Sequence, residues 1–288
     1  MKPLFCTLLV FDVFISKAIM ASTLRNAIVT GANRGLGLEM CRQMAATGDF
    51  SCIYAICRKS SPELHELANT GGDDTDGKSK VSVIEGVDMV ESDFASSALD
   101  SHLTHKDGSV LPISLLVHNA GAYGPSEGFS DPDEVYSSQS LDNVTPERLM
   151  YAFQLNSAAP LFLTKHLLPH LRAARNAKVI IISSAMGSIT ENGSGGHYGY
   201  RAAKAAVNMI GKSLSTDLKG DNISVGLIHP GFVHTGFGTG PGQDKRPGQR
   251  DVDESVQGVL QAIDKVNMET TGSFWHGNYG DGVRELPW

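Results

Sequence analysis

The stretch Thr30-Gly31-Ala32-Asn33-Arg34-Gly35-Leu36-Gly37 decides the fold. It follows a short apolar run and opens a helical pattern, so we place it at the turn from a strand to a helix. Gly31 would permit a tight turn, Gly35 would let the backbone approach a pyrophosphate, and Gly37 would let the helix pack closely on the sheet. Such a turn can be a simple connection. Its place after the first strand of an alternating chain favours nucleotide binding at the helix N-terminus.

Strand and helix patterns alternate from Asn26 onward. The predicted strands are 27–30, 52–57, 81–87, 114–118, 178–183 and 223–229, and the predicted helices are 36–46, 62–68, 93–105, 146–174 and 200–218. The long helix has Thr145 as its expected N-cap and Pro146 at its first position. This succession predicts a three-layer, doubly wound parallel sheet with helices on both faces, in one domain over residues 26–288. Ligands of such a sheet bind beyond the carboxyl ends of the strands.

The composition is that of an ordinary globular protein, with 288 residues, 41% apolar and 19% charged. The net charge of −7 argues against a general affinity for nucleic acid or anionic lipid. The four cysteines form no CxxC pair and no cluster with histidine, so we predict no metal site. Reduced, buried thiols favour the cytoplasm.

Residues 1–25 form an extension that the predicted fold does not need. The apolar run 4–15 resembles the core of a signal peptide, but Asp12 interrupts it, and it is too short to span a bilayer stably. Two interpretations stay open. The segment is either a targeting peptide for export or organelle import, or a non-essential extension upstream of Met20.

Tyr200 and Lys204 are the strongest candidates for catalysis. They lie four residues apart in a predicted helix, so their side chains project from one face. A phenol titrates too high for acid–base work at neutral pH, and a nearby ammonium favours phenolate, so we expect Lys204 to lower the pKa of Tyr200. Tyr198 is a rival, but Ala202 follows it at the same spacing. Without other motifs, Tyr200 and Lys204 could equally be a solvated surface pair.

Further motif residues follow other predicted strands. Ser184 ends the fifth strand, where a hydroxyl can bind a carbonyl oxygen; Ser183 could substitute for it, and either could merely cap a turn. Asn156 stands inside the long helix, where it could simply face solvent. His118-Asn119-Ala120-Gly121 and Pro230-Gly231-Phe232-Val233-His234-Thr235 could each be an ordinary turn at a strand end.

Together these motifs resemble the short-chain dehydrogenases/reductases, over residues 26–288. TGxxxGxG is that family's cofactor loop, NNAG becomes His118-Asn119-Ala120-Gly121 here, and PGxVxT matches residues 230–235. The resemblance implies a Rossmann-type fold, with catalytic Ser184, Tyr200 and Lys204, and with Asn156 anchoring a water that relays protons to the lysine. The expected cofactor-binding residues are Gly31, Asn33, Arg34, Gly35, Leu36, Gly37, Arg58, Asp88, Met89, Asn119, Ala120, Gly121, Tyr200, Lys204, Pro230, Gly231, Val233 and Thr235.

The segment between the serine and the tyrosine departs from the commonest family pattern. Tyr200 follows Ser184 by 16 residues, which is longer than usual. The glycine-rich insert 186–196 and the stretch from Tyr198 to Met209 look like those of the C-factor and sniffer-type carbonyl reductases, and so does the C-terminal segment 272–288.

The end of the second strand predicts the cofactor. An NAD enzyme usually carries an acid there for the ribose hydroxyls, but here Arg58 and Lys59 follow the strand, and the next acid is Glu63. Arg58 and Arg34 would instead attract a 2′-phosphate, although both could be ordinary surface arginines. The sequence therefore favours NADP(H).

These residues predict an NADP(H)-dependent oxidoreductase that interconverts a carbonyl and an alcohol on a small substrate. The alternative is a nucleotide-binding regulatory or signalling protein with little turnover, against which the complete Ser/Tyr/Lys set argues. A dehydratase or epimerase of the family's extended branch is disfavoured by the glycine spacing. Helices 146–174 and 200–218 could form a homodimer face or be solvated.

Overall fold

The computed structural model describes residues 25–70, 80–91, 99–105, 107–125, 132–237, 244–280 and 282–288. Its centre is an eight-stranded sheet in the order β3-β2-β1-β4-β5-β6-β7-β8, in which only β8 runs antiparallel to its neighbour. The strands are β1 (Asn26–Thr30), β2 (Cys52–Ile56), β3 (Lys80–Ile84), β4 (Leu115–His118), β5 (Lys178–Ile182), β6 (Ser224–His229), β7 (Ser273–Tyr279) and β8 (Gly282–Glu285). The strand order reverses between β1 and β4, where ligands of such sheets bind.

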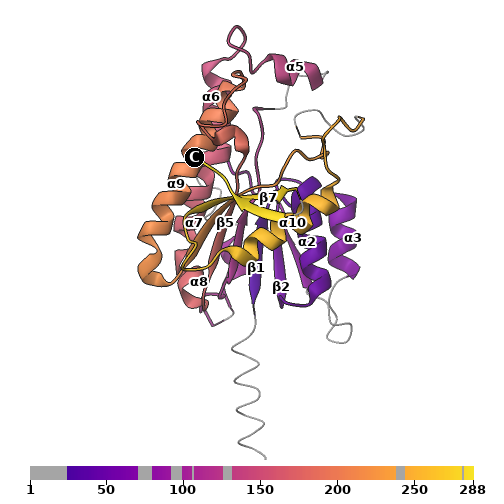
Figure 1. The fold of residues 1–288 in the computed structure, drawn as a ribbon. Helices are drawn as coiled ribbons and strands as arrows, with labels where there is room; N and C mark the ends of the chain where they lie inside the picture. Colours follow the sequence, from indigo (N-terminus) through magenta and orange to yellow (C-terminus); the bar gives the residue numbers. More distant parts are fainter. Residues whose placement is uncertain are drawn as a thin grey trace, which may run out of the picture.

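Helices cover both faces of the sheet (Figure 1). On one face pack α2 (Gly35–Thr47), α3 (Pro62–Thr70) and α10 (Val252–Lys265), and on the other α4 (Asp100–Leu103), α7 (Ala159–His166), α8 (Leu168–Ala173) and α9 (Tyr198–Asp217). Alternate strand residues divide between the two cores: Ala27 and Val29 face the first, and Ile28 faces the second. The predicted single-domain, three-layer Rossmann-type fold is confirmed.

The predicted helix 146–174 is not continuous. It consists of α6 (Pro146–Phe153), a π-helical turn η1 (Gln154–Ala158), α7 and α8. Pro160 has no N–H for the carbonyl of Asn156 four residues earlier, which explains why the α-helical ladder is interrupted there. The start was predicted correctly, since Thr145 caps it by accepting from the Arg148 N–H, and Pro146 begins it.

Several elements differ from the sequence prediction. The predicted helix 93–105 is described only from residue 99, where α4 occupies Asp100–Leu103. The strands β7 and β8 and the helices α5 (Pro132–Ser137) and α10 were not predicted. Because β8 is antiparallel, the sheet is mostly rather than wholly parallel.

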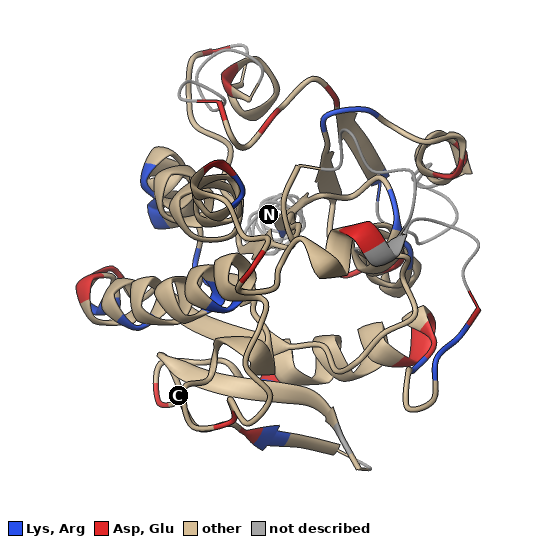
Figure 2. Cartoon of the chain, turned by 90° about the horizontal axis from the view of Figure 1, so that it is seen from above, with Lys and Arg blue, Asp and Glu red and all other residues tan. Residues whose placement is uncertain are grey.

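The predicted extension 1–25 lies outside the described residues, except for Arg25. None of the helices in the described ranges is long and apolar enough to cross a membrane. Seen from above, most of the charged residues lie on the helices and loops around the sheet (Figure 2).

Candidate active site

The glycine-rich turn between β1 and α2 has the geometry of a phosphate-binding loop. Gly31 has a φ of 66°, in the left-handed region that favours glycine, and a Cβ atom there would lie 2.9 Å from Cα of Ala120. A Cβ atom on Gly37 would lie 2.2 Å from the carbonyl oxygen of Gly31. Within the described helix α2, the N-cap Arg34 makes no side-chain capping bond, and the first turn holds no acidic residue. The N–H groups of this turn therefore suit an anionic phosphate.

The turn after β4 is tied to the end of β1, at the point where the strand order reverses. Asn119 Nδ2 donates to the carbonyl oxygens of Thr30 at 3.0 Å and of Gly31 at 3.2 Å. The Thr30 hydroxyl accepts from the backbone N–H groups of Asn119 and Ala120, both at 3.0 Å. Thr30 thus holds the two loops in register. Thr30 begins the glycine-rich motif, but this bridging role was not predicted from the sequence.

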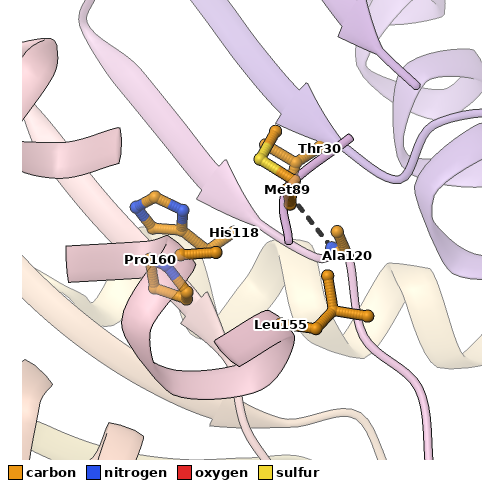
Figure 3. A pocket seen from close by; sticks show the side chains of 7 residues that line it. Thr30, Met89, His118, Ala120, Leu155 and Pro160 are labelled. Carbon is orange, nitrogen blue, oxygen red and sulfur yellow. Dashed lines mark hydrogen bonds between the residues drawn. The ribbon is translucent and has the colours of Figure 1, made fainter. Parts of the chain in front are cut away.

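His118 stands where the NNAG motif has its first asparagine, and its side chain is buried in the protein interior. Its Nε2 lies 2.8 Å from the Thr164 hydroxyl, and burial lowers its pKa to about 3, so the ring is neutral at physiological pH. A small pocket lies beside it between the strand ends and the η1 turn (Figure 3). The pocket is lined by Thr30, Met89, His118, Ala120, Leu155, Ala159 and Pro160.

Arg58 and Asp88 meet at the ends of β2 and β3. Arg58 Nη1 lies 3.6 Å from Asp88 Oδ2, and the two side chains are 61% and 30% exposed. An exposed pair at this distance is weak, so Arg58 stays able to bind an anion. The Ala32 N–H donates to the Ile56 carbonyl oxygen at 3.2 Å, which sets the glycine-rich loop against the end of β2. Arg58 therefore lies near the phosphate-binding turn.

The structure brings Ser184, Tyr200 and Lys204 together. Ser184 lies close enough to the Tyr200 hydroxyl to lower its pKa, and Lys204 Nζ lies 5.5 Å from the centre of the Tyr200 ring. Lys204 Nζ also donates to the carbonyl oxygen of Ile182, at the end of β5, over 2.8 Å. The two rivals lie elsewhere: the Ser183 hydroxyl donates to Asn208 Oδ1, and Tyr198 is 41% exposed.

The ionisation of this group differs from the sequence expectation. The pKa of Tyr200 is raised, first by burial and then by Tyr123, while Ser184 opposes the shift. Burial lowers the pKa of Lys204 to about 7. Tyr200 is 7% and Lys204 5% exposed, so both lie where neutral forms are favoured. The prediction that Lys204 lowers the pKa of Tyr200 is therefore wrong for this structure, in which burial raises that pKa.

Asn156 lies in the η1 turn and is 1% exposed, so it does not face solvent. Its Nδ2 donates to the carbonyl oxygens of Ala122 and Ala152, both at 2.8 Å, and its Oδ1 accepts from the Ala122 N–H. The neighbouring Ser157 donates to the Ala203 carbonyl oxygen at 2.7 Å, which joins this turn to α9 beside Lys204. The interrupted helix thus places Asn156 against the loop after β4, and its neighbour Ser157 against α9.

The loop after β6 lies against the glycine-rich turn. Gly231 has a φ of 91°, and the Pro230 carbonyl oxygen accepts from Ser255 and Asn278. A Cβ atom on Gly35 would lie 3.4 Å from Cβ of Thr235, so this loop faces the glycine-rich turn.

Aromatic side chains from four other segments form a cluster with Tyr200, in which Tyr123 and Phe237 contact the Tyr200 ring. No role was predicted for these four side chains from the sequence. The aromatic cluster consists of Tyr123, Tyr136, His197, Tyr200 and Phe237. Tyr123 is its centre, with ring centres 4.6 Å from Tyr200 and 4.8 Å from Phe237. Their spacing along the chain is irregular, so no local pattern could have predicted the cluster.

A model of the family described as short chain dehydrogenase matches residues 25–245. This range includes the glycine-rich turn, the Asn119-Ala120-Gly121 turn after β4 (the NAG turn) and the Ser/Tyr/Lys group. The chain belongs to the short-chain dehydrogenase family. Among relatives, C-signal of Myxococcus xanthus is 34% identical over 177 residues, or 62% of this chain and 93% of that protein.

Two solved structures of carbonyl reductases resemble this short-chain dehydrogenase. The NADPH-bound carbonyl reductase from chicken fatty liver has a TM-score of 0.74 and 26% identity, over 92% of this chain and 99% of that one. The carbonyl reductase Sniffer of D. melanogaster has a TM-score of 0.71 and 27% identity, over 92% of this chain and 100% of that one. The expected likeness to the C-factor and sniffer-type subgroup is thus confirmed.

In the described ranges, no three His, Cys, Asp or Glu side chains gather in a way that could hold a metal ion. Beside Tyr200, Ser184 supplies a hydroxyl and Lys204 an amine, which suit hydrogen bonding to a substrate oxygen and to sugar hydroxyls.

Proposed function

We propose that this short-chain dehydrogenase reduces an aldehyde or ketone to an alcohol with NADPH. One observation carries the proposal: the Ser184 hydroxyl, the Tyr200 phenol and the Lys204 amine meet at the carboxyl edge of the sheet, beside a glycine-rich turn suited to phosphate. When bound, NADPH supplies the hydride for the carbonyl carbon.

Ser184 and Tyr200 both act on the carbonyl oxygen of the substrate. Ser184 donates a hydrogen bond to the carbonyl oxygen and so stabilises the charge that develops there. Tyr200 donates its proton to the same oxygen. Its raised pKa keeps the phenol protonated, which is the form that reduction requires.

Lys204 and Asn156 do not touch the substrate oxygen but support the proton transfer from Tyr200. The ammonium form of Lys204 binds the ribose hydroxyls of the cofactor and favours the phenolate left after proton transfer. Asn156 holds a water that passes a proton toward Lys204, from its buried place in η1. No step requires a metal, because two hydroxyls and a cation meet the alkoxide.

The preference for NADPH over NADH rests on Arg58 and Arg34, since a guanidinium binds a phosphate with charge-assisted hydrogen bonds. The similar chicken reductase was solved with NADPH, and a similar Burkholderia multivorans protein with NADP. The other residues that we expect to bind the cofactor lie in the glycine-rich turn, in the NAG turn, at Asp88 and Met89, and in the loop 230–235.

The test is NADPH oxidation by the purified full chain against a panel of aldehydes, ketones and quinones. We expect turnover with at least one carbonyl class, and slower turnover with NADH. NADPH binding without turnover on any carbonyl would instead support the alternative of a nucleotide-binding regulatory protein, which the likeness to C-signal suggests.

A further inference from the structure

The aromatic cluster determines what can reach the proton donor. The Tyr200 ring lies 4.6 Å from the Tyr123 ring and 5.7 Å from the Phe237 ring, measured between centres. These rings come from the loop after β4, from α9 and from the loop after β6. A carbonyl group that accepts the Tyr200 proton must therefore sit among aromatic faces and edges.

His197 lies at the edge of this cluster in a constrained backbone. It follows Gly195 and Gly196, and all three residues have φ between 50° and 64°. This left-handed run directs the His197 ring to 5.5 Å from Tyr123 and 5.8 Å from Tyr136. Left-handed conformations are costly outside glycine and tend to persist where a site requires them.

One polar atom of this histidine has no hydrogen-bond partner among the described residues. His197 Nδ1 is buried and unpaired, which costs free energy unless a ligand pairs with it. Burial, and then the nearby Arg201, lower the pKa of His197, so the ring is neutral at pH 7. A neutral imidazole nitrogen either donates or accepts, and a hydroxyl group can pair with it in both cases.

We propose that His197 is a specificity-determining residue, which binds a hydroxyl group on an aromatic carbonyl substrate whose ring packs against Tyr123 and Phe237. The inference rests on the proposed reductase function and names its substrate class. The Tyr123 ring contacts both residues, with ring centres 4.6 Å from Tyr200 and 5.5 Å from His197. A substrate whose ring stacks on Tyr123 can therefore place its reacting carbonyl at Tyr200 and its hydroxyl at His197.

The experiment compares kcat/KM with NADPH for three ketones: meta-hydroxyacetophenone, acetophenone and cyclohexyl methyl ketone. In the wild type we expect acetophenone to exceed the cyclohexyl ketone, and the hydroxylated ketone to exceed acetophenone. His197→Gly should lower the ratio of hydroxylated to plain acetophenone roughly three- to tenfold, the value of one neutral hydrogen bond. The intrinsic reactivity of the two ketones cancels when this ratio is compared between wild type and variant, because the same two ketones are used with each protein.

Glycine suits the backbone at this position, so the variant should keep its fold, which thermal unfolding checks. Tyr198→Phe is the matched control, since Tyr198 is the next residue and is 41% exposed. It should leave the ratio unchanged. An unchanged ratio in His197→Gly overturns the inference, and so does a wild type that reduces aldehydes or the cyclohexyl ketone but prefers no aromatic ketone. In those cases the reductase function stands, whereas an absence of turnover on every carbonyl would sink the function itself.

Discussion

Replacing Lys204 with methionine should stabilise the folded protein while it removes activity. Burial lowers the pKa of Lys204 from 10.5 to about 7, so its amine binds a proton more tightly in the unfolded chain. Unfolding therefore makes Lys204 take up a proton between these two pH values, so the contribution of Lys204 to stability becomes more favourable as the pH rises from 7 toward 10.5. Lys204→Met removes this contribution.

The size of the effect follows from the shift. At roughly 1.4 kcal/mol per pKa unit, burying the lysine costs about 4 kcal/mol at pH 7 and about 1 kcal/mol at pH 10. Lys204→Met also loses the hydrogen bond to the Ile182 carbonyl oxygen, which costs about 1 kcal/mol at both pH values. The variant should therefore gain roughly 3 kcal/mol at pH 7 and almost nothing at pH 10.

Urea unfolding of both proteins at pH 7 and pH 10 measures this difference. Lys212→Met is the control, because Lys212 is exposed on the same helix, α9. It should change stability equally at the two pH values. A Lys204→Met effect that is also equal at both would refute the argument that Lys204 is buried with a lowered pKa.

Four further outcomes are expected. Arg58→Asp should reverse the preference from NADPH to NADH in kcat/KM, since the carboxylate repels the 2′-phosphate; an unchanged ratio would remove Arg58 from the cofactor site. Gly37→Ala should destabilise the fold by about 1–3 kcal/mol and weaken NADPH binding in a fluorescence titration, since its Cβ would overlap the loop backbone; wild-type affinity would contradict this. The kcat for reduction should fall as the pH rises through about 7, where Lys204 loses its charge, and a profile flat to pH 9 would show that this charge is not needed. A chain beginning at Met20 should fold and bind NADPH normally, and an insoluble product would show that the extension matters.

The sequence predicted the first six parallel strands because buried parallel strands are short, apolar and bounded by turn residues. It did not predict β7, which is also parallel to its neighbour β6. The phosphate-binding turn was predictable for a similar reason, since its glycines are fixed by local backbone geometry at Gly31 and by close packing at Gly37. Helix α10 was missed although its signal was present: Val256, Val259 and Ile263 recur on one face.

The ionisation of the site could not be predicted from the sequence. The spacing of Tyr200 and Lys204 showed that the two side chains share a helix face, but the direction of each pKa shift depends on burial. That burial comes from residues distant in the chain, such as Tyr123, whose ring packs on Tyr200. The interruption at Asn156 also depends on a specific local feature, Pro160, within an otherwise helical pattern.

The central claim is that Tyr200 donates the proton to the reduced carbonyl. The most direct measurement is the single-turnover rate of NADPH oxidation by Tyr200→Phe, alongside the Kd for NADPH. The phenyl ring keeps the packing against Tyr123 and Phe237 and removes only the hydroxyl. We expect the rate to fall roughly a hundredfold or more, the usual contribution of a positioned acid, with the Kd nearly unchanged. A Tyr200→Phe protein that keeps most of the wild-type rate, while Tyr198→Phe loses it, would contradict the account.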